Sequence, residues 1–308
     1  MEIRVIRGGP LTTVQDAGRP GHRAEGVPVG GAADHFALRL TNLLVGNPED
    51  AAVLECTLAG PTLEFSEDTT IAVGGADFAG VPSWRPLVVR AGGRLVLGPC
   101  HHGCRGYVAI AGGVDVPVVL GSRSTFLRAH LGGHEGRALK DGDVLHAGAW
   151  VLPHAVEHWR IDPQVLPHYS ASPVLRVVRG AQWDDFDAGC LGGEYGVTPV
   201  SDRMGLRLAG PTLVRRRGRD LLSSAVAPGT VQVPPDGQPI LLLADAQTIG
   251  GYPRLAHVIS VDLPLAAQLR PGDRVRFAEV TLEQAHWLWR QQYQNLAILR
   301  QGLAEKLQ

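Results

Sequence analysis

The chain has 308 residues, 44% of them hydrophobic, and a formal net charge of −1 at pH 7. This length suits two domains that each bury a core, and the charge gives no electrostatic basis for binding nucleic acid or an anionic membrane. No apolar run approaches the ~18 residues that span a bilayer, and the N-terminus lacks the apolar core of a secretory signal, so we expect a cytoplasmic protein. Four cysteines are too few for a disulfide scaffold.

Almost all of the 29 basic residues are arginines, because only Lys140 and Lys306 are lysines. Neither lysine follows a glycine, so no phosphate-binding P-loop can be written. Neither lies in a pattern typical of a Schiff-base pocket or a biotin-carrying hairpin. If ATP or biotin takes part in the chemistry, we expect another chain to hold its reactive end.

The predicted elements are mainly short strands. The 39 glycines and 22 prolines separate short apolar runs, a pattern that favours barrels or sandwiches over doubly wound sheets. The strand-like runs are 70–73, 87–89, 94–97, 107–110, 174–178, 239–244, 258–261 and 274–277.

Two helices are expected. Asp34 is placed to cap the first, and Gly46 to end it; its apolar face comprises Phe36, Leu40, Leu43 and Leu44. A capping box, Thr281 followed by Gln284, begins a C-terminal helix that runs to about Arg300. The inward stripe of this second helix comprises Ala285, Leu288, Leu296 and Leu299.

An internal repeat divides the chain. The segment LAGPTL at 58–63 reappears identically at 208–213. Weaker matches pair 34–40 with 202–208, 5–9 with 177–181, and 139–143 with 269–273. Two long copies indicate duplicated domains rather than a solenoid of short units. We expect a first barrel-like repeat at 1–152, a linker at 153–173, a second repeat at 174–281 and the C-terminal helix within 282–308.

Two segments contain residue types that bind metals. The linker has His154, His158 and His168, and the cluster Cys100-His101-His102-Gly103-Cys104 gathers four thiols and imidazoles. The linker histidines lack a third ligand at a convincing spacing, and four ligands this close in sequence cannot all reach one tetrahedral ion without backbone strain. We therefore expect no essential metal, and a hairpin turn at 100–104.

The segment 231–256 concentrates binding chemistry around the apolar run 239–244. A turn, 234–237, precedes this run, and the segment 245–254 after it gathers an amide, a hydroxyl, a phenol and a guanidinium around a Gly-Gly pair. Polar groups at the ends of a stiff strand are typical of binding sites. Turns also favour these residues for purely structural reasons.

The blocks at 13–21, 111–117 with 120–125, 197–205 and 231–256 resemble the KipA-like carboxyltransferase-subdomain family. That family includes the C subunit of ATP-dependent 5-oxoprolinase and the second half of the carboxyltransferase domain of urea carboxylase. The resemblance covers residues 1 to about 280. It implies a mainly β fold with two tandem cyclophilin-like β-barrel subdomains, and an obligate small partner subunit that shares the substrate site.

As a function, the resemblance implies one subunit of an ATP-dependent 5-oxoprolinase that hydrolyses 5-oxo-L-proline to L-glutamate. The implied partners are a smaller, KipI-like B subunit and a larger A subunit, with ATP and Mg held largely by a partner; self-association is a further option. One alternative is a biotin-dependent carboxyltransferase subunit related to urea amidolyase and allophanate hydrolase, with biotin on a partner. Another is a regulatory protein that binds and antagonises a kinase inhibitor. A chain without carboxylase or biotin-carrier segments favours the first.

Opening a lactam with ATP requires stabilised anionic oxygens, a task that suits arginines and the backbone amides beside glycines. We expect Arg203 and Arg254 to clamp anions, and Asp16, Asp202 or Asp236 to accept a proton or orient an arginine. Alanine at either arginine is expected to remove most activity and to change the melting temperature by only a few degrees. The residues expected to bind substrate are Gln15, Arg19, Ser201, Gln238, Gln247, Thr248, Gly250, Gly251 and Tyr252.

Structural roles compete with several of these assignments. Asp202 is equally placed to cap a helix of the second repeat, as Asp34 caps that of the first. Asp16 and Arg19 are close enough in sequence to pair within their own turn. Tyr252, which precedes a proline, fits a packed aromatic as well as a catalytic acid.

Overall fold

The computed structural model describes residues 1–149, 160–187, 189–216 and 221–307, so His154 and His158 of the expected linker lie outside the described residues. The chain packs as two compact units. The first comprises Met1–Arg19, Gly30–Pro167 and Gln294–Gln308, and the second comprises Pro20–Val29 and His168–Tyr293. The segment Pro20–Val29 thus belongs to the second unit, although the sequence places it within the first repeat.

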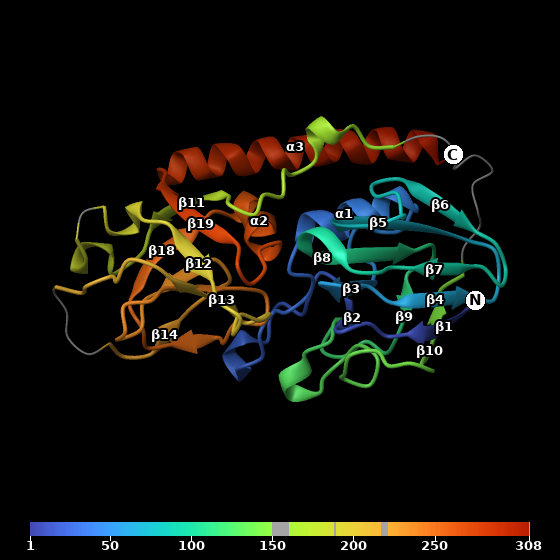
Figure 1. Ribbon diagram of the computed structural model, residues 1–308, viewed down its shortest axis with the longest axis horizontal. Helices are drawn as coiled ribbons and strands as arrows, with labels where there is room; N and C mark the ends of the chain where they lie inside the picture. Colours follow the sequence, from blue (N-terminus) through green and yellow to red (C-terminus); the bar gives the residue numbers. More distant parts are fainter. Residues whose placement is uncertain (150–159, 188, 217–220, 308) are drawn as a thin grey trace. The chain divides into compact units, whose positions relative to one another are not determined.

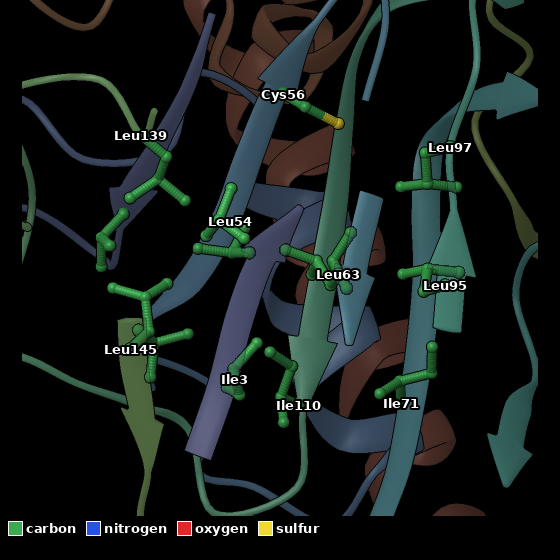
Figure 2. Packing of buried hydrophobic residues seen from close by; sticks show 14 of the residues in the cluster. Ile3, Leu54, Cys56, Leu63, Ile71, Leu95, Leu97, Ile110, Leu139 and Leu145 are labelled. Atoms are coloured by element: carbon green, nitrogen blue, oxygen red, sulfur yellow. The ribbon is translucent and has the colours of Figure 1, made fainter. Parts of the chain in front are cut away.

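Within the described residues, the first unit has ten strands in two sheets (Figure 1). The strands are β1 (Glu2–Arg7), β2 (Thr12–Gln15), β3 (Val53–Thr57), β4 (Thr62–Phe65), β5 (Thr69–Phe78), β6 (Pro86–Val89), β7 (Arg94–Val96), β8 (Cys100–Ile110), β9 (Val114–Asp115) and β10 (Val144–Ala147). One sheet has the order β7-β4-β1-β10-β9 and the other β2-β3-β8-β5-β6. Apolar side chains from both sheets, among them Ile3, Leu63, Leu54 and Ile71, form one core (Figure 2).

The first predicted helix is confirmed as α1 (His35–Leu44). Asp34 caps it, because its Oδ1 accepts a hydrogen bond from the backbone N of Ala37 at 2.9 Å. The helix packs on β5 and β8. Gly74 of β5 makes this packing close, since a β-carbon there would lie 2.6 Å from Cγ2 of Thr41 in the helix.

The second unit contains a closed barrel and a two-stranded sheet. The barrel strands are β11 (Val174–Arg179), β12 (Tyr195–Val197), β13 (Gly205–Ala209), β15 (Thr230–Gln232), β16 (Ile240–Leu242), β18 (Arg254–Val258) and β19 (Arg274–Glu279), and the small sheet pairs β14 (Ser224–Ala225) with β17 (Ile249–Gly250). The barrel order is β11-β18-β15-β16-β13-β12-β19. Leu175, Val231, Leu241 and Leu255 belong to its apolar core. The expectation of a mainly β, barrel-like fold is confirmed.

The remaining elements are helical. A short helix, α2 (Leu263–Ala267), lies in the second unit, and α3 (Leu282–Lys306) is the C-terminal helix. Single 3-10 turns occur at Arg23–Glu25, Leu127–Ala129, Pro163–Val165, Trp183–Asp185, Cys190–Gly192 and Ser260–Asp262. In the described part of the chain, no helix combines the length and apolar character needed to cross a membrane.

The capping box of α3 is confirmed. The backbone N of Thr281 donates to Oε1 of Gln284 at 2.9 Å, and the backbone N of Gln284 donates to Oγ1 of Thr281 at 3.2 Å. The helix continues past the predicted end near Arg300. Its buried residues are Leu296 and Leu303, so most of the predicted apolar stripe is only partly covered.

The internal repeat is visible in local structure. The first LAGPTL segment starts directly after β3, and the second starts within the last two residues of β13. Both strands pair antiparallel with the strand before them in the chain, β3 with β2 and β13 with β12. Two aspartates, Asp143 and Asp273, close equivalent turns directly before β10 and β19, because each carboxylate accepts the backbone N–H three residues earlier.

The sequence match of 34–40 with 202–208 does not extend to structure, and the alternative that Asp202 caps a helix is wrong. Asp34 starts a helix, whereas Asp202 precedes the strand β13. Oδ1 of Asp202 accepts the backbone N of Met204 at 2.8 Å, which is a turn contact and not a helix cap. Pairing of β13 with β12 and β16 overrides the helix-like pattern of this segment.

The expected hairpin turn at 100–104 is also wrong, because these residues begin the strand β8. Gly103 has a φ of 76°, and the register against β5 shifts nearby. Such a bulge explains how a strand could resemble a turn in sequence. Cys100 and Cys104 are buried. Within the described residues, no three His, Cys, Asp or Glu side chains are grouped as a metal site requires.

Candidate functional site

A buried polar layer lies on one face of the sheet that contains β2, β3 and β8. Thr13, Glu55 and Tyr107 are direct neighbours across these three strands. Their chain neighbours Val14, Leu54 and Val108 point to the apolar core, so the polar side chains occupy the opposite face. All three polar side chains are buried.

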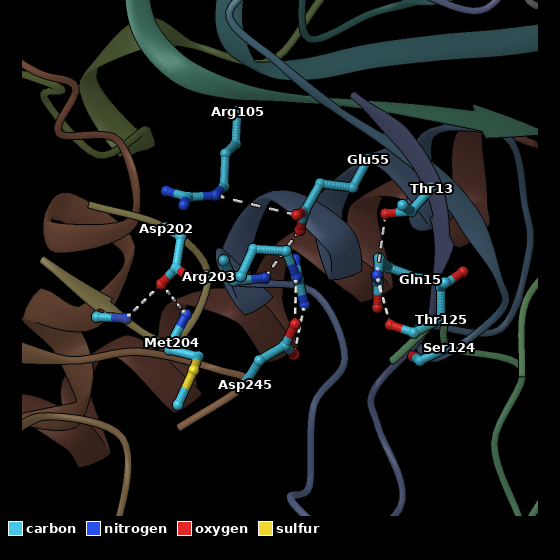
Figure 3. Close-up of polar contacts among 12 residues, drawn as sticks. Thr13, Gln15, Glu55, Arg105, Ser124, Thr125, Asp202, Arg203, Met204 and Asp245 are labelled. Atoms are coloured by element: carbon cyan, nitrogen blue, oxygen red, sulfur yellow. Dashed lines mark hydrogen bonds and ion pairs between the residues drawn. The ribbon is translucent and has the colours of Figure 1, made fainter. Parts of the chain in front are cut away.

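Glu55 is the centre of this layer (Figure 3). Its Oε2 accepts hydrogen bonds from the hydroxyl of Tyr107 at 2.8 Å and from the backbone N of Ala33 at 2.9 Å, and its Oε1 lies 3.9 Å from Nε of Arg105. The Tyr107 hydroxyl in turn accepts the backbone N of Asp34 at 2.8 Å. Burial, followed by the charge of Glu55, raises the pKa of Tyr107 well above its ordinary value. Glu55 thus holds the backbone that leads into α1 in two ways, by its direct hydrogen bond to Ala33 and through the Tyr107 hydroxyl that binds Asp34.

The predicted substrate residues Gln15 and Arg19 lie in the same unit and are fully buried. Nε2 of Gln15 donates to Oγ1 of Thr13 at 3.0 Å and to the backbone O of Thr125 at 3.1 Å, which links it to the polar layer (Figure 3). Nη2 of Arg19 donates to the backbone O of Ser124. Both side chains therefore bind the segment that carries Ser124 and Thr125.

Asp16, the predicted proton acceptor, is surrounded by hydrogen-bond donors. Its Oδ1 accepts from the hydroxyl of Ser122 at 2.6 Å, the hydroxyl of Ser124 at 2.5 Å and the backbone N of Gly18 at 2.8 Å. Its Oδ2 accepts from the backbone N of Arg123 at 2.5 Å. Through these contacts the carboxylate holds residues 122–124 against the end of β2.

In the second unit, Arg203 is paired with Asp245 (Figure 3). Nε of Arg203 donates to Oδ2 of Asp245 at 2.8 Å and Nη2 donates to Oδ1 at 3.0 Å, with both side chains 6% exposed. The backbone N of Asp245 also donates to the backbone O of Arg203 at 2.9 Å. The structure thus brings the 201–203 turn and the end of β16 together. Asp202 is exposed beside this pair in sequence and caps its own turn.

The predicted loop 247–252 is anchored on a buried amide. Nε2 of Gln247 donates to Oε1 of Gln232, a residue that is 1% exposed. Gly250 lies against the other end of that amide, since a β-carbon on it would be 2.7 Å from Nε2 of Gln232. Thr248 is buried, whereas Tyr252 is 45% exposed. Tyr252 is therefore not a core aromatic, and more than half of its surface is still covered.

Arg254 begins β18 directly after this loop. Its backbone N donates to Oε1 of Gln182 at 3.0 Å, and its Nη1 donates to the backbone O of Ala225 at 3.2 Å. The guanidinium is only partly covered, unlike that of Arg203. A partly exposed cation with a fixed backbone is suited to contact a ligand.

Asp236 and Gln238 lie in the turn before β16, whereas Asp245 and Gln247 follow that strand. Oδ1 of Asp236 accepts the backbone N of Gln238 at 3.0 Å, and Oε1 of Gln238 accepts the backbone N of Gly210 at 2.9 Å. These contacts tie the turn to the second LAGPTL segment and not to Arg203 or the 247–252 loop. Ser201 has a similar local task, since its Oγ accepts the backbone N of Arg207 at 3.0 Å.

Sequence reasoning missed the buried residues Glu55, Arg105, Tyr107 and Gln232, and the partly buried His257. One signal was available: Glu55 and Gln232 are isolated polar residues inside strand-like apolar runs. The catalytic and binding roles proposed for the residues above remain predictions.

Comparison with known proteins identifies the chain as one of the carboxyltransferase-domain proteins. Residues 25–279 match the family model described as carboxyltransferase domain, subdomain A and B, and the chain belongs to this family. The 5-oxoprolinase C subunit of Escherichia coli (strain K12) is 42% identical over 294 residues, which cover 92% of this chain and 93% of that protein.

The family also includes fused enzymes. The urea amidolyase of Lachancea kluyveri is 31% identical over 99% of this chain, which corresponds to 18% of that protein. The crystal structure of the K. lactis urea amidolyase aligns with a TM-score of 0.88 and 32% identity, covering 95% of this chain and 19% of that one. This chain therefore spans nearly the whole of the E. coli relative but about a fifth of the urea amidolyases.

Proposed function

We propose that this chain is one subunit of an ATP-dependent 5-oxoprolinase complex, which hydrolyses 5-oxo-L-proline to L-glutamate. The observation that carries the proposal is the 42% identity with the C subunit of E. coli 5-oxoprolinase, which extends across 93% of that protein. A match over nearly the full length of both chains supports a shared role more strongly than a match confined to one domain.

The second unit supplies groups that suit this substrate. A 5-oxoproline molecule carries a carboxylate and a planar amide, so its binding site needs a cation and groups that hydrogen-bond an amide. Arg254 supplies a partly exposed guanidinium, and Gln247 supplies an amide held in place by the buried Gln232. We assign substrate binding to this loop and its flanking strand.

We assign ATP and its Mg largely to partner subunits, namely a smaller B subunit and a larger A subunit. The reason is chemical: neither lysine of this chain follows a glycine, so the chain has no P-loop with which to hold a triphosphate. Hydrolysis in this proposal is a property of the complex, and the isolated chain is inactive.

A second candidate is a carboxyltransferase that acts on urea with biotin supplied by a partner. The observation that favours it is the TM-score of 0.88 with the K. lactis urea amidolyase. Urea and 5-oxoproline share a planar amide, but only 5-oxoproline carries a carboxylate. The two functions therefore differ in whether the site needs a cation for the substrate itself.

The test is an assay of the chain purified with its candidate partner subunits. We expect glutamate to appear from 5-oxoproline only when ATP and all subunits are present. Omitting this chain should abolish the activity. Carboxylation of urea by a biotin-loaded complex, without glutamate formation from 5-oxoproline, would support the second function and contradict the first.

A further inference from the structure

The strand β18 contains an irregularity that places two basic side chains on one face. Arg254 pairs with Gln232 of β15, and His257 pairs with Thr230, so three steps along β18 match two along β15. The additional residue makes a β-bulge, a feature that re-aims side chains. Without the bulge, positions 254 and 257 would point to opposite faces of the strand.

This face is turned away from the barrel interior. Val231 of β15 and its partner Ala256 of β18 belong to the apolar core. Gln232 and Thr230 are buried on the opposite side, and the side chains of Arg254 and His257 are partly exposed beside them. The four residues form a polar patch with two buried and two accessible members, adjacent to the 247–252 loop through the contact between Gln247 and Gln232.

The tautomer of His257 is inferred from its contact with Thr230. Oγ1 of Thr230 accepts the backbone N of Ala227 at 3.2 Å and lies 3.2 Å from Nδ1 of His257. The hydroxyl is fully buried, so its own hydrogen needs an acceptor, and Nδ1 is in reach. A neutral ring that accepts at Nδ1 carries its proton on Nε2.

The surroundings of His257 favour the neutral ring. Burial, and then the charge of Arg254, lower its pKa below the ordinary value. On the neighbouring strand β11 its partner is the uncharged Val178, and Arg176 of that strand is engaged by the carboxylate of Asp262. In the described part of the chain, Nε2 has no hydrogen-bond partner.

We propose that the guanidinium of Arg254 and the Nε2–H of His257 form a two-donor site for the carboxylate of the lactam substrate. The inference rests on the proposed function and extends it, because it assigns the residues that select a carboxylated lactam over an uncharged amide. A carboxylate has two oxygens and can accept a hydrogen bond from each of the two donors. Thr230 is a positioning residue that keeps the ring in the donating tautomer.

The test compares 5-oxo-L-proline with 2-pyrrolidinone, the same lactam ring without the carboxylate, as a substrate and a competitor in the reconstituted complex. His257→Leu removes the donor, whereas His257→Gln offers an amide N–H in its place. We expect His257→Leu and Arg254→Ala each to raise KM for 5-oxoproline about 10- to 100-fold, the loss typical of a charge-assisted hydrogen bond. His257→Gln should recover most of this loss.

In His257→Leu and Arg254→Ala, the preference for 5-oxoproline over 2-pyrrolidinone should fall by the same factor as KM rises. A purely structural defect would not change this preference. His102→Leu, at an exposed histidine of β8, is the control and should keep wild-type KM. An unchanged KM and preference in His257→Leu, with an active wild-type complex, would overturn this inference alone. A wild-type complex that does not hydrolyse 5-oxoproline would overturn the proposed function instead.

Discussion

Arg203 and Asp245, 42 residues apart in the chain, form a buried bidentate ion pair with Nε to Oδ2 at 2.8 Å and Nη2 to Oδ1 at 3.0 Å. Each side chain is only 6% exposed. Removal of one partner from such a pair leaves an uncompensated charge in a poorly solvated site. Arg203 therefore contributes to the fold of the barrel, whatever it contributes to ligand binding.

Arg203→Ala should consequently destabilise the chain by about 3–5 kcal/mol. This prediction differs from the expectation based on the sequence, which was that the substitution would change the melting temperature by only a few degrees. The reason is that the sequence did not reveal the partner. Chemical denaturation of the purified chain measures the effect. A loss below about 1 kcal/mol in the free energy of unfolding would show that water solvates the unpaired carboxylate of Asp245.

Arg254→Ala should behave in the opposite way. The Arg254 side chain is partly exposed and donates to the backbone O of Ala225, so we expect a loss of less than about 1 kcal/mol in the free energy of unfolding. Activity of the complex at low 5-oxoproline concentration should still fall about 10- to 100-fold, in line with the expected rise in KM. Arg207→Ala, at an exposed position of β13, is the control for both measurements.

Features that depend on neighbouring residues were predictable. The cap of Asp34 on α1 and the capping box of Thr281 each involve partners within three residues. The repeated LAGPTL segment needed only the comparison of the chain with itself. The mainly β fold class could be predicted from the spacing of glycines and prolines, because turns separate the short strands of a barrel or sandwich.

Features that depend on strand pairing were not predictable. Asp16 contacts the hydroxyl of Ser122 across 106 residues, and nothing near either residue indicates the other. The bulge that aligns Arg254 with His257 exists only in the register with β15. Asp202 shows most clearly what local sequence cannot predict. The sequence around it fits a helix cap, but the residues that follow form β13, which pairs with β12 and β16 of the barrel.

Gly250 and its neighbour Gly251 should respond differently to alanine. A β-carbon at Gly250 would lie 2.7 Å from Nε2 of the buried Gln232, so either the loop or the Gln232 amide must shift. At Gly251 the nearest atom, Oγ of Ser223, would be 3.4 Å away, which is an ordinary contact. We expect Gly250→Ala to cost about 1–3 kcal/mol and to reduce activity of the complex. Gly251→Ala should have little effect on either.

The double variant Gly250→Ala, Gln232→Ala provides a check on this cause. Truncation of Gln232 removes the atom that the new methyl group would meet, so the double variant should be less destabilised than the sum of the single variants. Denaturation curves of the four proteins give the coupling free energy. Strict additivity would show that the strain arises elsewhere in the loop.

Tyr107→Phe tests the polar layer of the first unit. The change removes the hydroxyl that donates to Glu55 and accepts the backbone N of Asp34, and it leaves both groups buried without that partner. We expect a loss of about 1–3 kcal/mol. Tyr195→Phe is a matched control in the second unit, because the Tyr195 hydroxyl makes one long hydrogen bond, 3.3 Å, to the backbone O of Cys190. An equal effect of both changes would argue against a special role of the layer.

Asp143 should make the stability of the first unit depend on pH. Its two oxygens accept hydrogen bonds from Nη1 and Nη2 of Arg137 at 2.7 and 2.9 Å, and this pairing lowers the pKa of the carboxyl from 3.8 to about 2. A carboxyl whose pKa is lower in the folded than in the unfolded chain stabilises the fold above its ordinary pKa, and this contribution disappears as the pH falls towards 2.

Asp143→Asn should therefore destabilise the chain at pH 7 by about 1–2 kcal/mol, and the difference from wild type should shrink as the pH falls from about 4 towards 2. The amide retains an oxygen for the backbone N of Lys140, so the turn itself is preserved. Glu135→Gln, which removes an exposed carboxylate from the same arginine, should change stability by less than about 0.5 kcal/mol. Urea denaturation of the three proteins across this pH range measures the effect, and a difference between Asp143→Asn and wild type that stays constant down to pH 2 would contradict the assigned ion pair.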